Sequence, residues 1–168
     1  MARLPDVALP DGTAGVMDNV MHRVIARNRA MADNFYSLAN SIHRETNLPD
    51  RIKEFAILRV TSRAGSDFEF SHHFVGCQTL GITAQEARAV RDGGLAGFPE
   101  AERAAIALAD AVDANCVTDA LWQAAAAHLS EVQLLDLVMT ASFYGYASRL
   151  CNGLGIPADP GYPTITEA

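Results

Sequence analysis

The residues of this chain that could transfer protons are concentrated in one segment. Glu69, His73 and Cys77 follow one another at intervals of four residues, which places them on one face of a helix. Upstream, Glu54 interrupts an otherwise apolar stretch, and a buried carboxylate needs a partner. A histidine held between two carboxylates can change its charge near neutral pH. The pattern indicates acid/base chemistry, with Glu54, Glu69 and His73 as candidate catalytic residues.

Two helices and the turn between them must position these residues. The sequence predicts a helix over residues 50–63 and another over 66–81, with Gly65 between them. If the two helices pack as an antiparallel hairpin, Glu54 and His73 come together near its open end. The predicted site therefore depends on that hairpin.

Other interpretations of the same residues lead to different chemistry. His72 projects about 100° away from His73, so it is a secondary candidate that is structural or exposed. Glu69, His73 and Cys77 offer three metal ligands on one face, but no second ligand pair of the H-E-x-x-H type is present. Neither G-x-S-x-G nor a glycine-rich nucleotide loop occurs. We therefore expect no metal and no cofactor.

The composition is that of one globular domain with an acidic surface. The chain has 168 residues and a formal net charge of −7, which argues against a nucleic-acid partner. Its three cysteines are widely spaced, and no secretory signal is recognisable. No uncharged apolar run is long enough to span a membrane. We expect a cytoplasmic protein with reduced thiols and no membrane partner.

The pattern of helix starts and stops predicts an all-α fold, a multi-helix bundle. No run shows the alternation that is typical of strands. Capping-box patterns begin two of the helices, at Thr83 and at Ser130. An irregular arm is expected over residues 1–15, a single helical domain over 16–157 and an extended tail over 158–168. The predicted helices cover about residues 16–44, 50–63, 66–81, 83–92, 99–115, 118–129 and 130–149.

The pattern C-x-x-L-G-I occurs twice, over Cys77–Ile82 and Cys151–Ile156. The repeat reflects either chance, because Leu-Gly often ends a helix, or an internal duplicated helical hairpin. Under duplication the second copy cannot transfer protons in the same way, since Ala147 stands at the position of His73. Tyr144 of that copy could offer a hydroxyl group to a ligand.

Three short motifs along the chain are shared with a known superfamily. Lys53–Leu58 has the form of an R-E-L-x-x-L helix, and Phe68–His73 has the form of a Y-E-W-x-x-H motif. The turn around Gly81 matches a G-[ILV]-[ST]-x-x-E pattern. Together these motifs resemble the carboxymuconolactone decarboxylase and alkyl hydroperoxidase D superfamily, over about residues 20–157. The resemblance implies a bundle of the alkyl hydroperoxidase D-like type and a homo-oligomer.

The superfamily has two branches that differ in their reactive residues. In the hydroperoxidase branch a glutamate, a C-x-x-C pair and a histidine act together. On this chain the glutamate corresponds to Glu54 and the histidine to His73, whereas the cysteine positions hold Ser66 and Glu69. A cycle in which one thiolate attacks a peroxide and a second resolves it therefore lacks both thiols. The decarboxylase branch, which has a carboxylate and a histidine without the dithiol, resembles the chain better.

The resemblance implies a cofactor-independent lyase or isomerase that acts on a small organic acid or lactone. His73 would be the acid/base group, and Arg59 could bind an acidic substrate. Two alternatives stay open: a thiol-dependent hydroperoxide reductase that uses Cys77, and a non-catalytic oligomeric helical module that binds a ligand. The sequence leaves the substrate, the pathway and the number of subunits undetermined.

Overall fold

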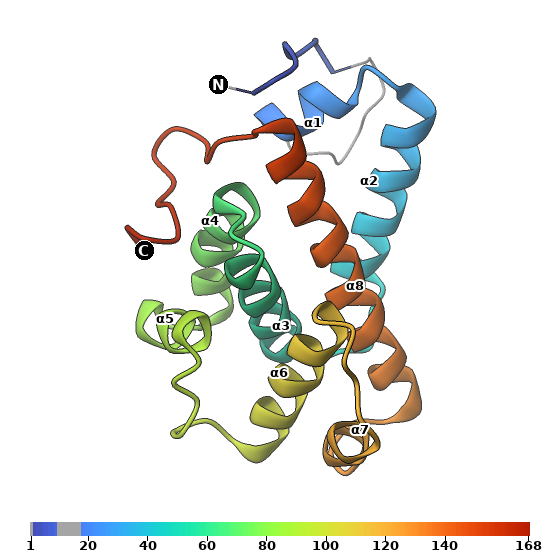
Figure 1. The fold of residues 1–168 in the computed structure, drawn as a ribbon, viewed down its shortest axis with the longest axis vertical. Coiled ribbons are helices and arrows are strands. Elements are labelled where there is room, and N and C mark those ends of the chain that lie inside the picture. The colour runs from blue at the N-terminus through green and yellow to red at the C-terminus, as the bar shows by residue number, and fades with distance from the viewer. Residues whose placement is uncertain (1, 10–17) are drawn as a thin grey trace.

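A computed structural model describes residues 2–9 and 18–168 of the chain, and all the regular secondary structure in these residues is helical (Figure 1). The predicted all-α fold is confirmed. The elements in chain order are α1 (Val20–Ile25), α2 (Arg29–Arg44), α3 (Asp50–Arg63), α4 (Asp67–Gly76), the 3-10 helix η1 (Cys77–Leu80), α5 (Ala84–Asp92), α6 (Glu100–Asp113), α7 (Asp119–Ala126) and α8 (Glu131–Leu154).

Helix α3 occupies the centre of the bundle. It packs against α4, α5, α6 and α8, which surround it in Figure 1. Four consecutive residues, Phe55, Ala56, Ile57 and Leu58, have no exposed surface. A helix that is covered on all sides must be apolar all round, as this segment is. Glu54, which precedes the four, is therefore carried into the interior of the protein.

The turn at Gly65 reverses the chain between α3 and α4. Gly65 has φ of 65°, in the left-handed region that glycine enters without steric cost. The amide of Ser66 donates to the carbonyl oxygen of Thr61, which closes the turn. Helices α3 and α4 pack against each other as the predicted hairpin, and this arrangement determines the geometry of the candidate site.

Several predicted helix ends differ from the observed ones. The helix expected over residues 16–44 is interrupted after α1, because Asn28 accepts a hydrogen bond from the amide of Met31 and starts α2 anew. Residues 16 and 17, and residues 1 and 10–15 of the predicted arm, lie outside the described residues. Asp50, a residue type that favours the capping position, is instead the first residue of α3, and Pro49 precedes it as the N-cap. The two predicted capping boxes form at Thr83 and Ser130, and α8 continues to Leu154.

The repeated C-x-x-L-G-I pattern forms the same helix ending twice. Gly81 and Gly155 are both left-handed, and in each copy the isoleucine amide donates to the cysteine carbonyl oxygen. The likeness ends there. The first copy turns at Gly65, whereas Met139, its counterpart in the second copy, lies inside the continuous helix α8. The duplicated hairpin suggested by the sequence is therefore confined to its last few residues.

The C-terminal segment, residues 156–168, folds back along α4 and α5, where it is visible in Figure 1. Arg91 of α5 donates to the carbonyl oxygens of Ile165 and Ala168, at 2.8 and 3.0 Å. The amide of Ile165 donates to Asp67 at the start of α4. These contacts give the segment a defined position beside α4.

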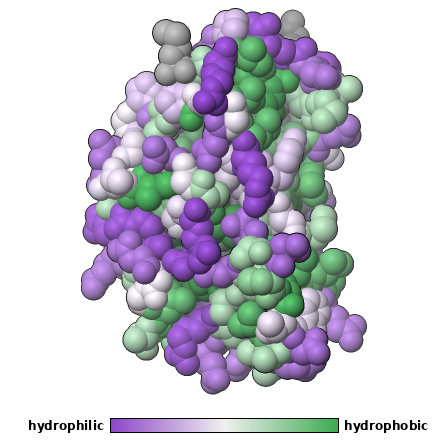
Figure 2. All heavy atoms as spheres, viewed as in Figure 1, coloured by the Kyte–Doolittle hydropathy of each residue, from purple (hydrophilic) through white to green (hydrophobic). Residues whose placement is uncertain are grey.

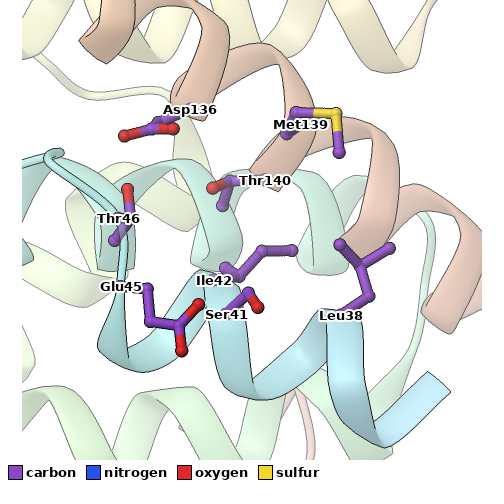
Figure 3. Close-up of a pocket in the computed structure, with 8 residues that line it drawn as sticks. All are labelled: Leu38, Ser41, Ile42, Glu45, Thr46, Asp136, Met139 and Thr140. Carbon is purple, nitrogen blue, oxygen red and sulfur yellow. The ribbon is translucent and has the colours of Figure 1, made fainter. Parts of the chain in front are cut away.

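The outer surface mixes hydrophilic and hydrophobic side chains, as Figure 2 shows for one face. Within residues 2–9 and 18–168, no helix combines the length and apolar character that crossing a membrane would need. A groove of about 210 Å³ separates α2 from α8, with the carboxylates of Glu45 and Asp136 on its rim (Figure 3). No histidine, cysteine, lysine or arginine lines this groove. It therefore offers no histidine–carboxylate pair.

Candidate active site

Glu54 of α3 and His73 of α4 form a direct pair. Nδ1 of His73 donates to Oε2 of Glu54 at 2.7 Å. The His73 side chain is 11% exposed and the Glu54 side chain 8%. The hairpin thus brings together two of the three candidate catalytic residues. Because one ring nitrogen is held by the carboxylate, the other, Nε2, is the nitrogen available to a ligand.

Each member of the pair favours the charged form of the other. Burial acts to lower the pKa of His73, but the charge and hydrogen bond of Glu54 outweigh it and hold that pKa above its ordinary value of 6.5. Burial likewise acts to raise the pKa of Glu54, and the His73 charge reverses this effect. The pKa of Glu54 is therefore lowered. The contact between the two side chains therefore favours the form with an imidazolium beside a carboxylate.

A cavity of about 330 Å³ opens beside this pair. Glu54 and His73 line it together with three further ring-bearing residues, His43, His72 and Tyr162. None of its lining residues is a lysine or an arginine. Among the residues that line the cavity, the groups that can become cationic are its three histidines, and His73 is the one whose pKa is raised. A ligand of moderate size could therefore contact an acid group and several planar side chains at once.

His43 reaches the cavity from the last turn of α2. Its ring stacks on that of His73, with the centroids 5.6 Å apart, and its Nε2 shares a hydrogen bond of 2.8 Å with the Tyr144 hydroxyl. Burial, and then the charge on His73, lowers the pKa of His43. Lys53 is 3% exposed and donates to the His43 carbonyl oxygen, which fixes the end of α2. His43 lies outside the α3–α4 hairpin and its motifs, so the spacing of the motif residues could not identify it.

Tyr144, a secondary candidate from the sequence, lies beneath the two histidines. Its ring stands edge-on to His73, with the centroids 4.8 Å apart. Burial, together with the charges of the nearby glutamates, raises the pKa of Tyr144 well above 10.0. The phenol therefore stays protonated and acts as a hydrogen-bonding support for His43.

His72 also lines the cavity, which the helical angle alone did not predict. Its Nε2 donates to Oδ2 of Asp159 at 3.0 Å. Its ring lies between Phe68 and Tyr162, at centroid distances of 4.6 and 4.4 Å. The C-terminal segment, which was expected to be an extended tail, thus supplies two neighbours of this histidine.

Glu69 is separated from the cavity. It is 6% exposed, does not line the cavity, and accepts a hydrogen bond of 3.5 Å from Sγ of Cys151. Burial raises the pKa of Glu69. The predicted convergence of both carboxylates on one pocket is therefore wrong for Glu69. The i, i+4 spacing placed it on the correct face of α4 but at a depth where α8 covers it.

Two other secondary candidates, Cys77 and Arg59, do not line the cavity. Cys77 has no exposed surface, its Sγ donates to the Phe74 carbonyl oxygen, and burial raises its pKa to about 11. Arg59 binds both carboxylate oxygens of Asp110 at 2.9 Å and does not line the cavity. In the part of the chain that the structure describes, no group of three or more His, Cys, Asp or Glu residues is arranged to hold a metal ion.

No family model matches the sequence, and no curated protein matches it. Solved structures do match. The alkylhydroperoxidase AhpD core of a peroxidase-related protein from Ralstonia eutropha has a TM-score of 0.81 and 18% identity, covering 95% of this chain and 93% of its own. A peroxidase-related protein from Silicibacter sp. TM1040 has a TM-score of 0.80 and 16% identity, covering 92% and 88%.

A debrominase, Bmp8, solved in complex with 2,3,4-tribromopyrrole, also has this fold. Its TM-score is 0.74 at 20% identity, and the match covers 86% of this chain and 79% of the debrominase. These likenesses establish that the chain has the AhpD-like fold, as its motifs predicted. The fold hosts enzymes with different reactions, so the reaction must be argued from the site.

Proposed function

We propose that the protein is a cofactor-independent proton-transfer enzyme, a lyase or isomerase, that acts on a small unsaturated lactone or related organic acid. The observation that carries this proposal is the buried His73–Glu54 pair beside the cavity. An imidazolium whose charge is stabilised by a carboxylate is a proton donor at neutral pH.

The chemistry follows from the geometry of the pair. Glu54 holds Nδ1 of His73, so Nε2 carries the proton that a substrate receives. When a carboxylate leaves a carbon conjugated to a carbonyl group, its C–C bond breaks and the electron pair spreads onto the carbonyl oxygen. His73 then protonates the resulting dienolate at carbon, and carbon dioxide is the other product. This step needs an acid, and the active-site electrostatics stabilise the developing negative charge.

The cavity lining bears on the class of substrate. Because Arg59 is bound to Asp110 and no lysine or arginine lines the cavity, a substrate with several carboxylates would find few cationic partners. A lactone with at most one carboxylate fits this lining better. The debrominase of the same fold was solved with a small planar heterocycle, which supports a ring-shaped ligand.

The test is release of carbon dioxide from a butenolide that carries a carboxylate on its γ carbon. We expect the wild-type protein to catalyse it and His73→Gln to lose about 100-fold or more. His128→Gln is the matched control, because His128 is exposed at the end of α7 and does not line the cavity. Equal rates for the wild-type protein and His73→Gln would overturn the proposal.

Thiol-dependent peroxide reduction is a second candidate, favoured by the peroxidase-related names of two proteins with this fold. It is disfavoured by Cys77, which is sealed from solvent and has a raised pKa, because the thiolate is the reactive form. A variant with Cys77→Ala, Cys116→Ser and Cys151→Ser separates the two functions. We expect it to keep its decarboxylase rate, whereas a peroxide turnover abolished by these substitutions would favour the reductase.

A further inference from the structure

One histidine of the cavity belongs to a second histidine–carboxylate pair, which the proposed decarboxylation does not use. His72 donates from Nε2 to Asp159 at 3.0 Å, and the two side chains are 13% and 19% exposed. His72 lines the same cavity as His73, its neighbour in sequence. Because Asp159 belongs to the C-terminal segment, this pair exists only when that segment lies against α4.

The surroundings of His72 hold its ring in one orientation. Phe68 packs on it from α4, and Tyr162 stacks on it from the C-terminal segment, with an angle of 26° between the two rings. The segment is itself fixed by Arg91 of α5 and Asp67 of α4, as described above. With the proton on Nε2 directed to Asp159, Nδ1 is the basic nitrogen of His72.

The pKa values of the two neighbouring histidines are displaced in opposite directions. Burial lowers the pKa of His72, against the effect of Asp159, whereas the pKa of His73 is raised. Titratable groups with pKa values displaced in opposite directions are typical of an acid and a base that serve one reaction. His43 shares its hydrogen bond with the Tyr144 hydroxyl instead of a carboxylate, which makes it a weaker base than His72.

We propose that His72 is the proton acceptor of the site, positioned by Asp159, and that the protein isomerises β,γ-unsaturated lactones to their α,β-unsaturated forms. The inference rests on the proposed function, because it takes His73 as the proton donor. Residues on one helix would then supply both the base and the acid.

The proposed step is balanced in protons and electrons. Nδ1 of His72 takes a proton from the carbon next to the lactone carbonyl, and the C–H electron pair passes into a dienolate. His73 delivers a proton from Nε2 to the γ carbon, so that the double bond moves into conjugation with the carbonyl. His72 then releases its proton to water, and His73 regains one from water. No oxidant, reductant or cofactor takes part.

The probe is α-angelica lactone, whose conversion to the conjugated isomer is followed by NMR alongside decarboxylation of the carboxylated butenolide. Decarboxylation needs only the acid, whereas isomerisation needs both groups. We therefore expect His72→Gln to lose about 100-fold or more of the isomerisation rate, and this loss should exceed its loss of the decarboxylation rate by about tenfold or more. His73→Gln should lose both reactions, and His128→Gln neither.

Asp159 is tested as a positioning residue through the pH profile. Asp159→Asn removes the charge that supports protonated His72, so the acid limb of the isomerisation profile should move to lower pH and the rate should fall by about tenfold. A His72→Gln variant that still isomerises the lactone would overturn the inference, and so would equal loss of both reactions in that variant. Absence of decarboxylation in the wild-type protein would instead overturn the proposed function.

Discussion

Glu54 and Glu69 lie on the two helices of one hairpin and are equally buried, yet they differ in charge. Each is 6% exposed. Burial raises the pKa of Glu69, whereas at Glu54 the same effect is outweighed by His73 and the pKa is lowered. Equal burial therefore leaves a charged carboxylate at one position and favours a protonated one at the other.

The difference lies in the partner of each carboxylate. Glu54 contacts an imidazole that can become positive, at 2.7 Å, whereas Glu69 contacts the thiol of Cys151 at 3.5 Å. A thiol donates a weak hydrogen bond and cannot supply a positive charge. A buried carboxylate becomes part of a proton-transfer pair when its partner can hold the proton as a cation.

The largest expected effect is that of Glu54→Gln on activity. The amide keeps a hydrogen-bond acceptor for His73 but removes the charge that stabilises the imidazolium, so the pKa of His73 should fall. We expect the decarboxylation rate at neutral pH to fall by about 100-fold. Steady-state rates across the pH range check this prediction, and an unchanged rate would show that the charge of Glu54 is not needed.

The pair should also make stability depend on pH. The lowered pKa of Glu54 contributes stability that is lost as pH falls through its folded value, below 4.5. The raised pKa of His73 contributes stability that is complete below 6.5 and is lost as pH rises through its folded value. Urea unfolding at about pH 5.5 and about pH 9 should therefore show a larger loss in the wild-type protein than in Glu54→Gln. His72 titrates in both proteins, so the comparison isolates the pair.

The smallest expected effect is that of Glu69→Gln. Since burial favours the protonated form of Glu69, a neutral amide of the same shape should change the decarboxylation rate by less than about threefold. Decarboxylation rates of Glu69→Gln and Glu54→Gln, measured under the same conditions, check this prediction. A loss as large as that of Glu54→Gln would mean that Glu69 acts as a charged group.

Local sequence patterns predicted the hairpin and one contact of the site. The Gly65 turn and the apolar residues around Glu54 were sufficient to bring Glu54 to His73, because the contact lies within two consecutive helices. His43 and Asp159 could not be found in this way, since one comes from α2 and the other from a segment without helical pattern. Their positions depend on tertiary packing.

The same limit explains why the sequence did not predict the position of Glu69 outside the cavity lining. Spacing along α4 fixes the face on which a residue lies, but the depth of that face depends on α8, which contributes Cys151 from far along the chain. Arg59 is a second example of an effect of tertiary packing. The sequence suggested that its guanidinium group could bind a substrate, but this group binds Asp110 of α6.

The most direct test of the account is an NMR titration of the five histidine rings, assigned through His→Gln variants. We expect His73 to stay protonated above pH 6.5 and His43 and His72 to titrate below that value. Glu54→Gln should lower the pKa of His73, whereas Glu69→Gln should barely change it. A His73 that titrates below 6.5 in the wild-type protein, or equally in both variants, would contradict the claim that Glu54 maintains a proton donor in this cavity.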